Sequence, residues 1–138
     1  KAKEKLATEN TESTEKAVVD QLTEKIIAAA IEVHKTLGSG LLESIYGEAL
    51  CIELGLMGVS FQRQLAVDVL YKGYAIQGQR LDLLVANEVV VEIKSLRALP
   101  EVATAQLLSY LKATGLKRGL LLNFGEKQMI SGVKRISL

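Results

Sequence analysis

The sequence has few of the residues that build disulfides, cysteine-rich metal centres or membrane spans. Among its 138 residues Cys51 is the only cysteine, which excludes an internal disulfide, a cysteine-type zinc site and a four-cysteine iron–sulfur cluster. We therefore expect a reducing, cytoplasmic setting. No apolar run approaches the roughly 20 residues that cross a bilayer, so no membrane partner is expected. The only histidine, His34, falls near the end of a predicted helix, where packing or the helix dipole explains it better than catalysis.

The composition is that of an ordinary soluble protein, with 49% hydrophobic and 24% charged residues. A chain of this length forms one domain with its own core. Residues 1–19 are rich in Glu, Lys and Thr and poor in apolar residues, which predicts a polar tail that is disordered or extends the first helix. Residues 20–138 are predicted to form the single domain.

Apolar periodicity and turn residues divide this domain into two helices, three strands, a helix and two further strands. Three consecutive strands favour an antiparallel meander, and a helix between the third and fourth strands permits a crossover to a parallel neighbour. We therefore expect an α/β (α+β) fold with a mixed sheet flanked by helices. The predicted helices cover residues 20–37, 41–54 and 100–114, and the predicted strands cover residues 59–71, 74–86, 88–94, 118–124 and 133–138.

The helices carry apolar stripes with a few polar residues at informative positions. In the second helix Glu43 falls at the border of the apolar sector, in line with Tyr46, so its carboxylate is semi-buried or faces a cleft. A helix N-terminal Glu stabilised by the helix dipole is the alternative. In the third helix Gln106 and Tyr110 are four residues apart and share a face. The predicted packing residues are Ile27, Ile31, His34 and Leu37 in the first helix, Leu42, Ile45, Ala49 and Ile52 in the second, and Leu107, Leu111 and Thr114 in the third.

Residues 80–95 contain the most informative pattern, two apolar strands joined by a tight turn and interrupted by Asp82, Glu92 and Lys94. Charges within such strands are costly unless they are paired or bound to a metal. A three-residue loop centred on Asn87 places Asp82 directly opposite Glu92, with Cβ atoms roughly 4.5–5.5 Å apart. Two carboxylates this close share a proton or a cation, and a hard divalent cation such as Mg²⁺ suits the second case.

Two alternatives remain open for this hairpin. A two-residue turn at Asn87 and Glu88 would put Asp82 and Glu92 on opposite faces, although no Asn-Gly or Asp-Gly pair favours the shorter turn. The hairpin is also compatible with a surface position in which Glu88, Glu92 and Lys94 form a solvated face. Asp82 fits that position poorly, because apolar residues flank it on both sides.

The net charge of +1 hides an uneven distribution. Between residues 94 and 138 eight basic residues stand against Glu101 and Glu126, which leaves this third of the chain at +6. A basic end beside an acidic pocket suits a polyanion whose scissile phosphate meets a metal. Ordinary solvated surface charges are the alternative, and the near-neutral total does not favour tight non-specific binding to nucleic acid.

Several motifs along the chain resemble those of a known nuclease superfamily. Asp82 followed by Glu92-Ile93-Lys94 resembles the signature of the PD-(D/E)xK nucleases, which share a restriction-endonuclease-like fold. Gln106-Leu-Leu-Ser-Tyr110 resembles the QxxxY motif of the branch related to RecB and Cas4 nucleases. Gly40-Leu-Leu-Glu43-Ser-Ile-Tyr46 resembles the signature of the GxxExxY proteins. The resemblance covers residues 20–138.

This resemblance implies a nuclease that depends on Mg²⁺ or Mn²⁺. The implied partner is nucleic acid, DNA before RNA, and a homodimer is left open. Leu81 stands where the named motif has proline, and the cysteines of a Cas4-type cluster are missing. The implied catalytic residues are Glu43, Asp82, Glu92 and Lys94, the implied metal ligands are Glu43, Asp82, Glu92 and the carbonyl of Ile93, and the implied substrate-binding residues are Gln106, Tyr110 and Tyr46.

Two other functions are compatible with the same residues. The first is a non-catalytic nucleic-acid-binding module, in which the acidic cluster is a relic or a structural metal site. The second is a protein-interaction or regulatory domain, in which the charged face is merely surface. The sequence distinguishes neither DNA from RNA nor an endonuclease from an exonuclease.

Overall fold

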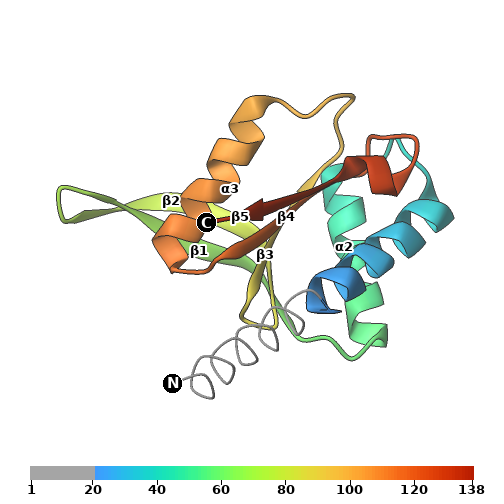
Figure 1. Ribbon diagram of the computed structural model, residues 1–138, viewed down its shortest axis with the longest axis horizontal. Coiled ribbons are helices and arrows are strands. Elements are labelled where there is room, and N and C mark those ends of the chain that lie inside the picture. Colours follow the sequence, from blue (N-terminus) through green and yellow to red (C-terminus); the bar gives the residue numbers. More distant parts are fainter. Residues whose placement is uncertain (1–20) are drawn as a thin grey trace, which may run out of the picture.

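A mixed five-stranded β-sheet lies at the centre of the structure, and helices pack on both of its faces (Figure 1). The computed structural model describes residues 21–138, so the predicted tail of residues 1–19 lies outside the described residues. Within them no helix has both the length and the apolar character that a membrane crossing requires. The helices are residues 21–37, α2 (Glu43–Leu56), α3 (Glu101–Thr114) and the 3-10 helix η1 (Met129–Gly132), and the strands are β1 (Phe61–Tyr71), β2 (Tyr74–Val85), β3 (Val89–Lys94), β4 (Arg118–Asn123) and β5 (Val133–Ser137).

The strands lie side by side in chain order, β1-β2-β3-β4-β5. All neighbours are antiparallel except β3 and β4, which are parallel because α3 carries the chain back between them. The predicted fold class and element order are thereby confirmed, and the observed bounds lie within about two residues of the predicted ones. The short helix η1 was not predicted.

Two hydrophobic cores lie on the two faces of the sheet. The first joins the helix of residues 21–37 and α2 to the sheet, and the second joins α3 to it. In β3, residues Val89, Val91 and Ile93 belong to the first core and Val90 to the second, as the alternation of strand side chains requires. Because β3 is covered on both faces, every residue from Val89 to Ile93 is buried, including the carboxylate-bearing Glu92.

The packing stripe predicted for the second helix is wrong. Its members Leu42, Ile45 and Ile52 are 74%, 47% and 58% exposed, and Ala49 is half-buried. The buried residues of α2 are instead Tyr46, Leu50, Cys51 and Leu54. Apolar residues occupy two opposite sides of this helix, so periodicity alone could not identify the side that faces the sheet.

The stripe predicted for the first helix is wrong in part. Ile27 and His34 are buried, but Ile31 and Leu37 are 41% and 38% exposed. The small residues Ala29 and Ala30 are buried and let this helix approach the sheet on the side next to the predicted one. In α3, the predicted packing of Leu107 and Leu111 is confirmed, and Thr114 is half-buried.

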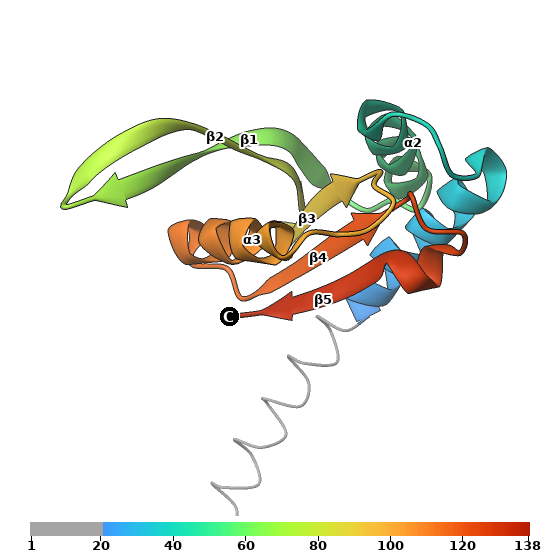
Figure 2. The same cartoon turned by 90° about the horizontal axis from the view of Figure 1, so that it is seen from above.

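The hairpin of β1 and β2 projects beyond the rest of the sheet (Figures 1 and 2). The two strands pair over nearly their whole length, whereas β3 pairs with β2 only at residues 83–85. Residues 66–80, here called the β-arm, therefore extend as a two-stranded ribbon. Its tip is a two-residue turn at Lys72 and Gly73, whose φ angles of 50° and 83° are those of a type I′ hairpin turn.

Candidate active site

The turn between β2 and β3 has the geometry on which the predicted site depends. Leu83 pairs with Val91 and Val85 with Val89, which leaves a three-residue loop at 86–88. In this loop Asn87 adopts a left-handed conformation with a φ angle of 58°. The predicted register is therefore confirmed, and it places Asp82 opposite Glu92.

Asp82 and Glu92 are joined by two reciprocal hydrogen bonds. The backbone N–H of Asp82 donates to Oε1 of Glu92 at 3.0 Å, and the backbone N–H of Ile93 donates to Oδ2 of Asp82 at 2.8 Å. The regular pairing of β2 with β3 stops at Leu83 and Val91, so side-chain carboxylates take over where the backbone ladder ends. Each carboxylate is thus fixed by the backbone of the opposite strand.

Burial makes this carboxylate pair electrostatically unusual. Glu92 is 3% exposed, and its pKa is raised from an ordinary value of 4.5 to about 8. Desolvation is the largest cause of this rise in pKa, and the charge of Asp82 is the second. The bond from the Asp82 N–H and the nearby Lys94 ammonium lower the pKa by less. At neutral pH the pair therefore holds a proton unless a cation takes its place.

A cavity of about 250 Å³ opens beside Asp82, between α2 and the sheet. Glu43 and Ser44 line it from the start of α2, and Asp82 and Ile93 line it from β2 and β3. Glu92 does not line this cavity, and in the described part of the chain no three acidic, histidine or cysteine side chains converge on one metal-sized point. The structure brings Asp82 and Glu92 together and places Glu43 across the same cavity from Asp82.

Tyr46 fixes the loop that carries Glu43. Its hydroxyl donates to the Gly38 carbonyl at 2.5 Å and accepts the Leu41 N–H at 3.1 Å, while its ring stacks on Phe124 with centroids 4.5 Å apart. Gly40 within this loop has a φ angle of 102°, which only glycine adopts readily. Because Tyr46 is fully buried and its hydroxyl is occupied, we assign it a positioning role in place of the predicted substrate contact.

Gln106 and Tyr110 share a face of α3 as predicted and touch each other. Gln106 Nε2 donates to the Tyr110 hydroxyl at 3.0 Å, and that hydroxyl donates to the Arg80 carbonyl at 3.2 Å. Tyr110 therefore ties α3 to β2 two residues before Asp82. Burial and the charge of Glu92, in that order, raise the pKa of the Tyr110 phenol. Gln106 stays half-buried beside the site.

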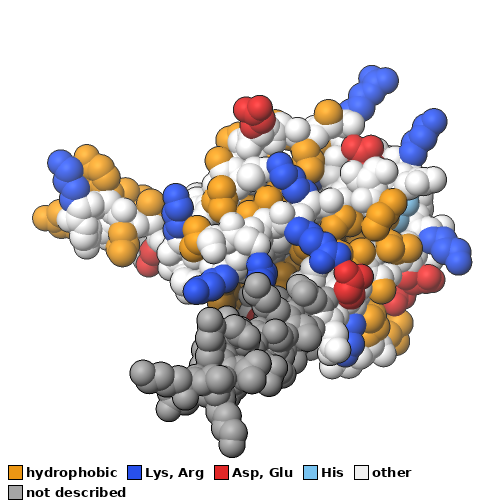
Figure 3. Space-filling view, in the orientation of Figure 1, with side chains coloured by type: hydrophobic (Ala, Val, Ile, Leu, Met, Phe, Trp, Pro, Cys, Tyr) orange, Lys and Arg blue, Asp and Glu red, His pale blue; other side chains and the backbone are white. Residues whose placement is uncertain are grey.

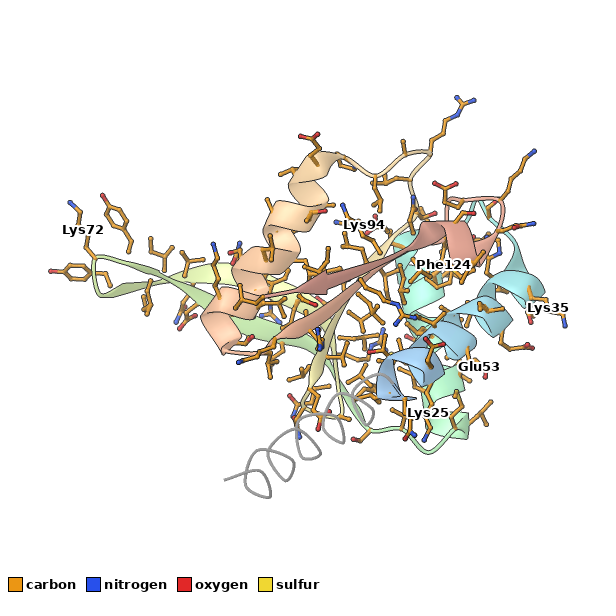
Figure 4. All side chains as sticks on the ribbon, viewed as in Figure 1. Lys25, Lys35, Glu53, Lys72, Lys94 and Phe124 are labelled. Atoms are coloured by element: carbon orange, nitrogen blue, oxygen red, sulfur yellow. The ribbon has the colours of Figure 1, made fainter. Side chains whose placement is uncertain are left out.

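Lys94, labelled in Figure 4, is the last residue of β3. It lies on the same side of the strand as Glu92 because the two residues are two positions apart. It is half-buried, and its ammonium makes no ion pair or hydrogen bond within residues 21–138. An unpaired cation beside the buried Glu92 is available to a ligand of negative charge.

Asn123, which was not among the predicted site residues, is fully buried at the end of β4. Its Oδ1 accepts the Leu96 and Gly125 N–H groups at 2.9 and 3.1 Å, and its Nδ2 donates to the Leu96 carbonyl at 3.0 Å. Asn123 therefore holds the segment that follows Lys94. The sequence feature that could have indicated Asn123 is a polar residue at the end of an otherwise apolar strand.

His34 packs, as expected, with Nε2 2.8 Å from the Glu126 carbonyl oxygen.

The residues present fit a hard divalent cation. Asp82 and Glu92 offer adjacent carboxylate oxygens, and their mutual repulsion is relieved by a proton or by a cation. Cys51 also lines the cavity. The pKa of its thiol is raised, mainly by burial, so the thiol stays protonated and is a poor metal ligand. Carboxylate oxygens are the donors that hard divalent cations prefer.

The structure is a mixed sheet flanked by helices, with an acidic pair where β2 and β3 stop pairing and a lysine beside that pair. These features define a restriction-endonuclease-like domain. The chain belongs to the PD-(D/E)XK nuclease superfamily, whose family model matches residues 20–136. A solved structure described as "Crystal structure of SSO0001" is similar in fold, with a TM-score of 0.52 and 23% sequence identity over 68% of this chain. The match spans 48% of that protein. Comparison with curated proteins finds no match.

Proposed function

We propose that the protein is a metal-dependent nuclease that hydrolyses phosphodiester bonds of nucleic acid. The observation that carries this proposal is the reciprocally bonded pair of the half-buried Asp82 and the buried Glu92, with the unpaired Lys94 on the same side of β3 as Glu92. A pair of this kind is costly to keep without a ligand, and perturbed carboxylates concentrate at functional sites. Membership of the superfamily supports nucleic acid as the substrate class.

Each site residue has a role in this proposal. Asp82 and Glu92 hold Mg²⁺ or Mn²⁺, with the Ile93 carbonyl as a further ligand and Glu43 across the cavity. A cation bound there supplies polarisation of the phosphate and a lowered pKa for a bound water. Lys94, as an ammonium, orients the attacking water and stabilises charge on the phosphate.

The substrate is proposed to run over α3 and the basic C-terminal third. Gln106 is the polar side chain best placed to contact the nucleic-acid backbone, and Tyr110 acts by holding α3 against β2. Basic side chains on the face seen in Figure 3 are scattered among apolar ones. Arg135 is bonded to Glu24 at 2.5 Å, and Lys134 to Thr104 at 2.9 Å. Because the basic side chains are scattered and two of them are already bonded, they are better suited to guiding a substrate toward the site than to tight non-specific binding.

DNA is proposed before RNA, and the chain is proposed to fall among the GxxExxY proteins and near the RecB and Cas4 branch. The local geometry gives each residue of the GxxExxY motif a physical role. Gly40 supplies the left-handed turn, Glu43 reaches the cavity, and Tyr46 clamps the loop between them. The buried, free Cys51 supports a reducing, cytoplasmic setting.

A second candidate is a nucleic-acid-binding module without catalysis. It is favoured by one observation, that Glu43 does not join Asp82 and Glu92 in a three-carboxylate cluster. In that case the cation at the pair stabilises the fold and no bond is cleaved.

Cleavage of single- and double-stranded DNA and RNA with Mg²⁺ or Mn²⁺ tests the proposal. Lys94→Ala and Asp82→Asn should each lower the rate by about 100-fold or more. Lys35→Ala is a matched control, because Lys35 lies exposed on the helix of residues 21–37, away from Lys94 (Figure 4). Cleavage that survives both site substitutions identifies a contaminating nuclease. Binding without cleavage by the wild-type protein favours the second candidate.

A further inference from the structure

The tip of the β-arm exposes large apolar side chains far from the candidate active site. Tyr71, Tyr74 and Ile76 are 60%, 76% and 52% exposed. Tyr71 and Tyr74 pair directly across the turn, so both side chains lie on one face of the ribbon. Figure 3 shows apolar side chains gathered with a basic one at this end of the molecule, and Figure 4 identifies Lys72 at the tip.

A two-stranded ribbon of this kind is marginally stable in water unless one face is covered. The β-arm is twisted and bulged between Val67 and Val69, and its outer half has no third strand. Exposed aromatic and aliphatic residues concentrated on such an element mark an interaction surface.

The same chain contains a groove where α3 lies beside the β-arm. The groove has a volume of about 540 Å³ and lies between the β-arm and α3. Val69 and Leu70 form one wall, and Ala105 and Leu108 form the other. Asp68 and Lys112 stand at its polar margins. A mainly apolar groove and an apolar tip therefore occur within a few residues of each other.

We propose that the β-arm mediates a symmetric homodimer, in which the tip of each arm fills the groove of a second copy. A two-fold contact brings the same surfaces together twice, so one chain must carry both complementary parts, as this chain does. The tip begins at Tyr71, one residue beyond Leu70 of the groove and only about 3 Å farther along the strand. Two antiparallel arms can therefore exchange tips around an axis beside the groove.

Charge and area are consistent with a second copy. The Lys72 ammonium at one tip approaches the Asp68 carboxylate at the partner's groove, and neither group forms an ion pair within the described residues. The exposed parts of the two tyrosines and Ile76 offer roughly 350 Å² of tip surface, and two such tips seated in two grooves place that surface in the contact twice.

Nucleic acid fits this surface less well. Residues 66–80 carry Lys72 and Arg80 against Asp68, which leaves little net positive charge. Exposed aliphatic side chains such as Leu70 and Ile76 gain little from stacking with bases. The exposed stripe of α2 is a second apolar surface, but Ile52 and Leu56 line none of the cavities described, so that face offers no matching recess.

The test is the oligomeric state of the full chain by analytical ultracentrifugation from low to high micromolar concentration. The wild-type protein should dimerise. The tip variant Tyr71→Ser/Tyr74→Ser and the groove variant Ala105→Arg should each raise the dimer dissociation constant about tenfold or more. All three altered residues are exposed, so the thermal unfolding midpoint serves as a check that the fold is kept. Leu56→Ser on α2, equally exposed at 77%, is the matched control and should dimerise like the wild type.

Mixing the tip variant with the groove variant distinguishes tip exchange from contact between two tips. Their heterodimer keeps one intact tip and one intact groove, so it should form more readily than either homodimer. A monomeric wild type, a dimer that survives both arm variants, or a mixture that gives no heterodimer overturns the proposal. Loss of the dimer in Leu56→Ser moves the interface to α2 and also overturns it. Weaker binding of a DNA oligonucleotide by the tip variant, without a change in oligomeric state, assigns the β-arm to nucleic acid instead.

Discussion

Metal-free protein is expected to lose stability as the pH rises, because folding forces Glu92 to keep its proton. The folded-state pKa of Glu92 is about 8, against an ordinary value of 4.5. Below the lower value both states bind this proton, and between the two values only the folded state does. Stability therefore falls with pH over this interval, and the full cost is present above the folded-state pKa.

The size of this loss follows from the shift in pKa. One unit corresponds to about 1.4 kcal/mol, so a rise from 4.5 to about 8 corresponds to roughly 5 kcal/mol. Between about pH 5 and about pH 8 most of this interval is crossed, which corresponds to about 3.5 kcal/mol. Solvent that enters the open cavity beside Asp82 screens part of the charge, so we expect the free energy of unfolding to fall by about 2–3 kcal/mol. At about 3 °C per kcal/mol for a chain of this size, the unfolding midpoint falls by about 6–9 °C.

The assay is thermal unfolding followed by circular dichroism, in a chelator, at about pH 5 and about pH 8. Glu92→Gln keeps an acceptor for the Asp82 N–H and removes the charge, so its midpoint should lack most of the wild-type decrease. Glu88→Gln removes a carboxylate from the exposed loop of the same hairpin and should retain that decrease. A wild-type midpoint that is unchanged between the two pH values, or a Glu92→Gln midpoint that falls as far as the wild type, would show that folding is not coupled to the Glu92 proton.

Three further outcomes follow from the same contacts. At pH 8, Mg²⁺ or Mn²⁺ should raise the unfolding midpoint of the wild type and not that of Asp82→Asn, and equal binding to both by calorimetry would contradict a site at the pair. Tyr46→Phe should lower stability in urea by about 1–3 kcal/mol, because both hydrogen bonds of its buried hydroxyl are lost. The exposed Tyr71→Phe should be neutral in the same assay. Asn123→Ala should cost about 2–4 kcal/mol in urea, and a loss below about 0.5 kcal/mol would contradict its role as a clamp.

The hairpin shows how far a local pattern reaches. The residues around Asn87 predicted a three-residue loop, and that loop alone sets which residues of β2 and β3 face each other. The juxtaposition of Asp82 and Glu92 was therefore predictable. Their exchange of hydrogen bonds with the opposite backbone was not, because it depends on where the two strands separate.

The position of Glu43 could be predicted from the local sequence only in part. Its spacing from Tyr46 suggested a position at the border of a buried face, and the structure places it on a cavity shared with Asp82. How far it stands from the carboxylate pair depends on the loop that Tyr46 clamps and on the packing of Tyr46 against Phe124. These contacts join segments distant in the chain and leave no local signal.

From the sequence we could predict the order and type of the long helices and strands, favour one register of β2 and β3, and identify the acidic pair as candidate residues. Each of these depends on neighbours a few residues away, through turn geometry and the alternation of strand side chains. Only the tertiary structure decided which apolar side of α2 faces the sheet, since both sides satisfy helical periodicity. It also decided that Tyr46 and Asn123 act as internal clamps, because a buried polar group must find its partners wherever the fold brings them.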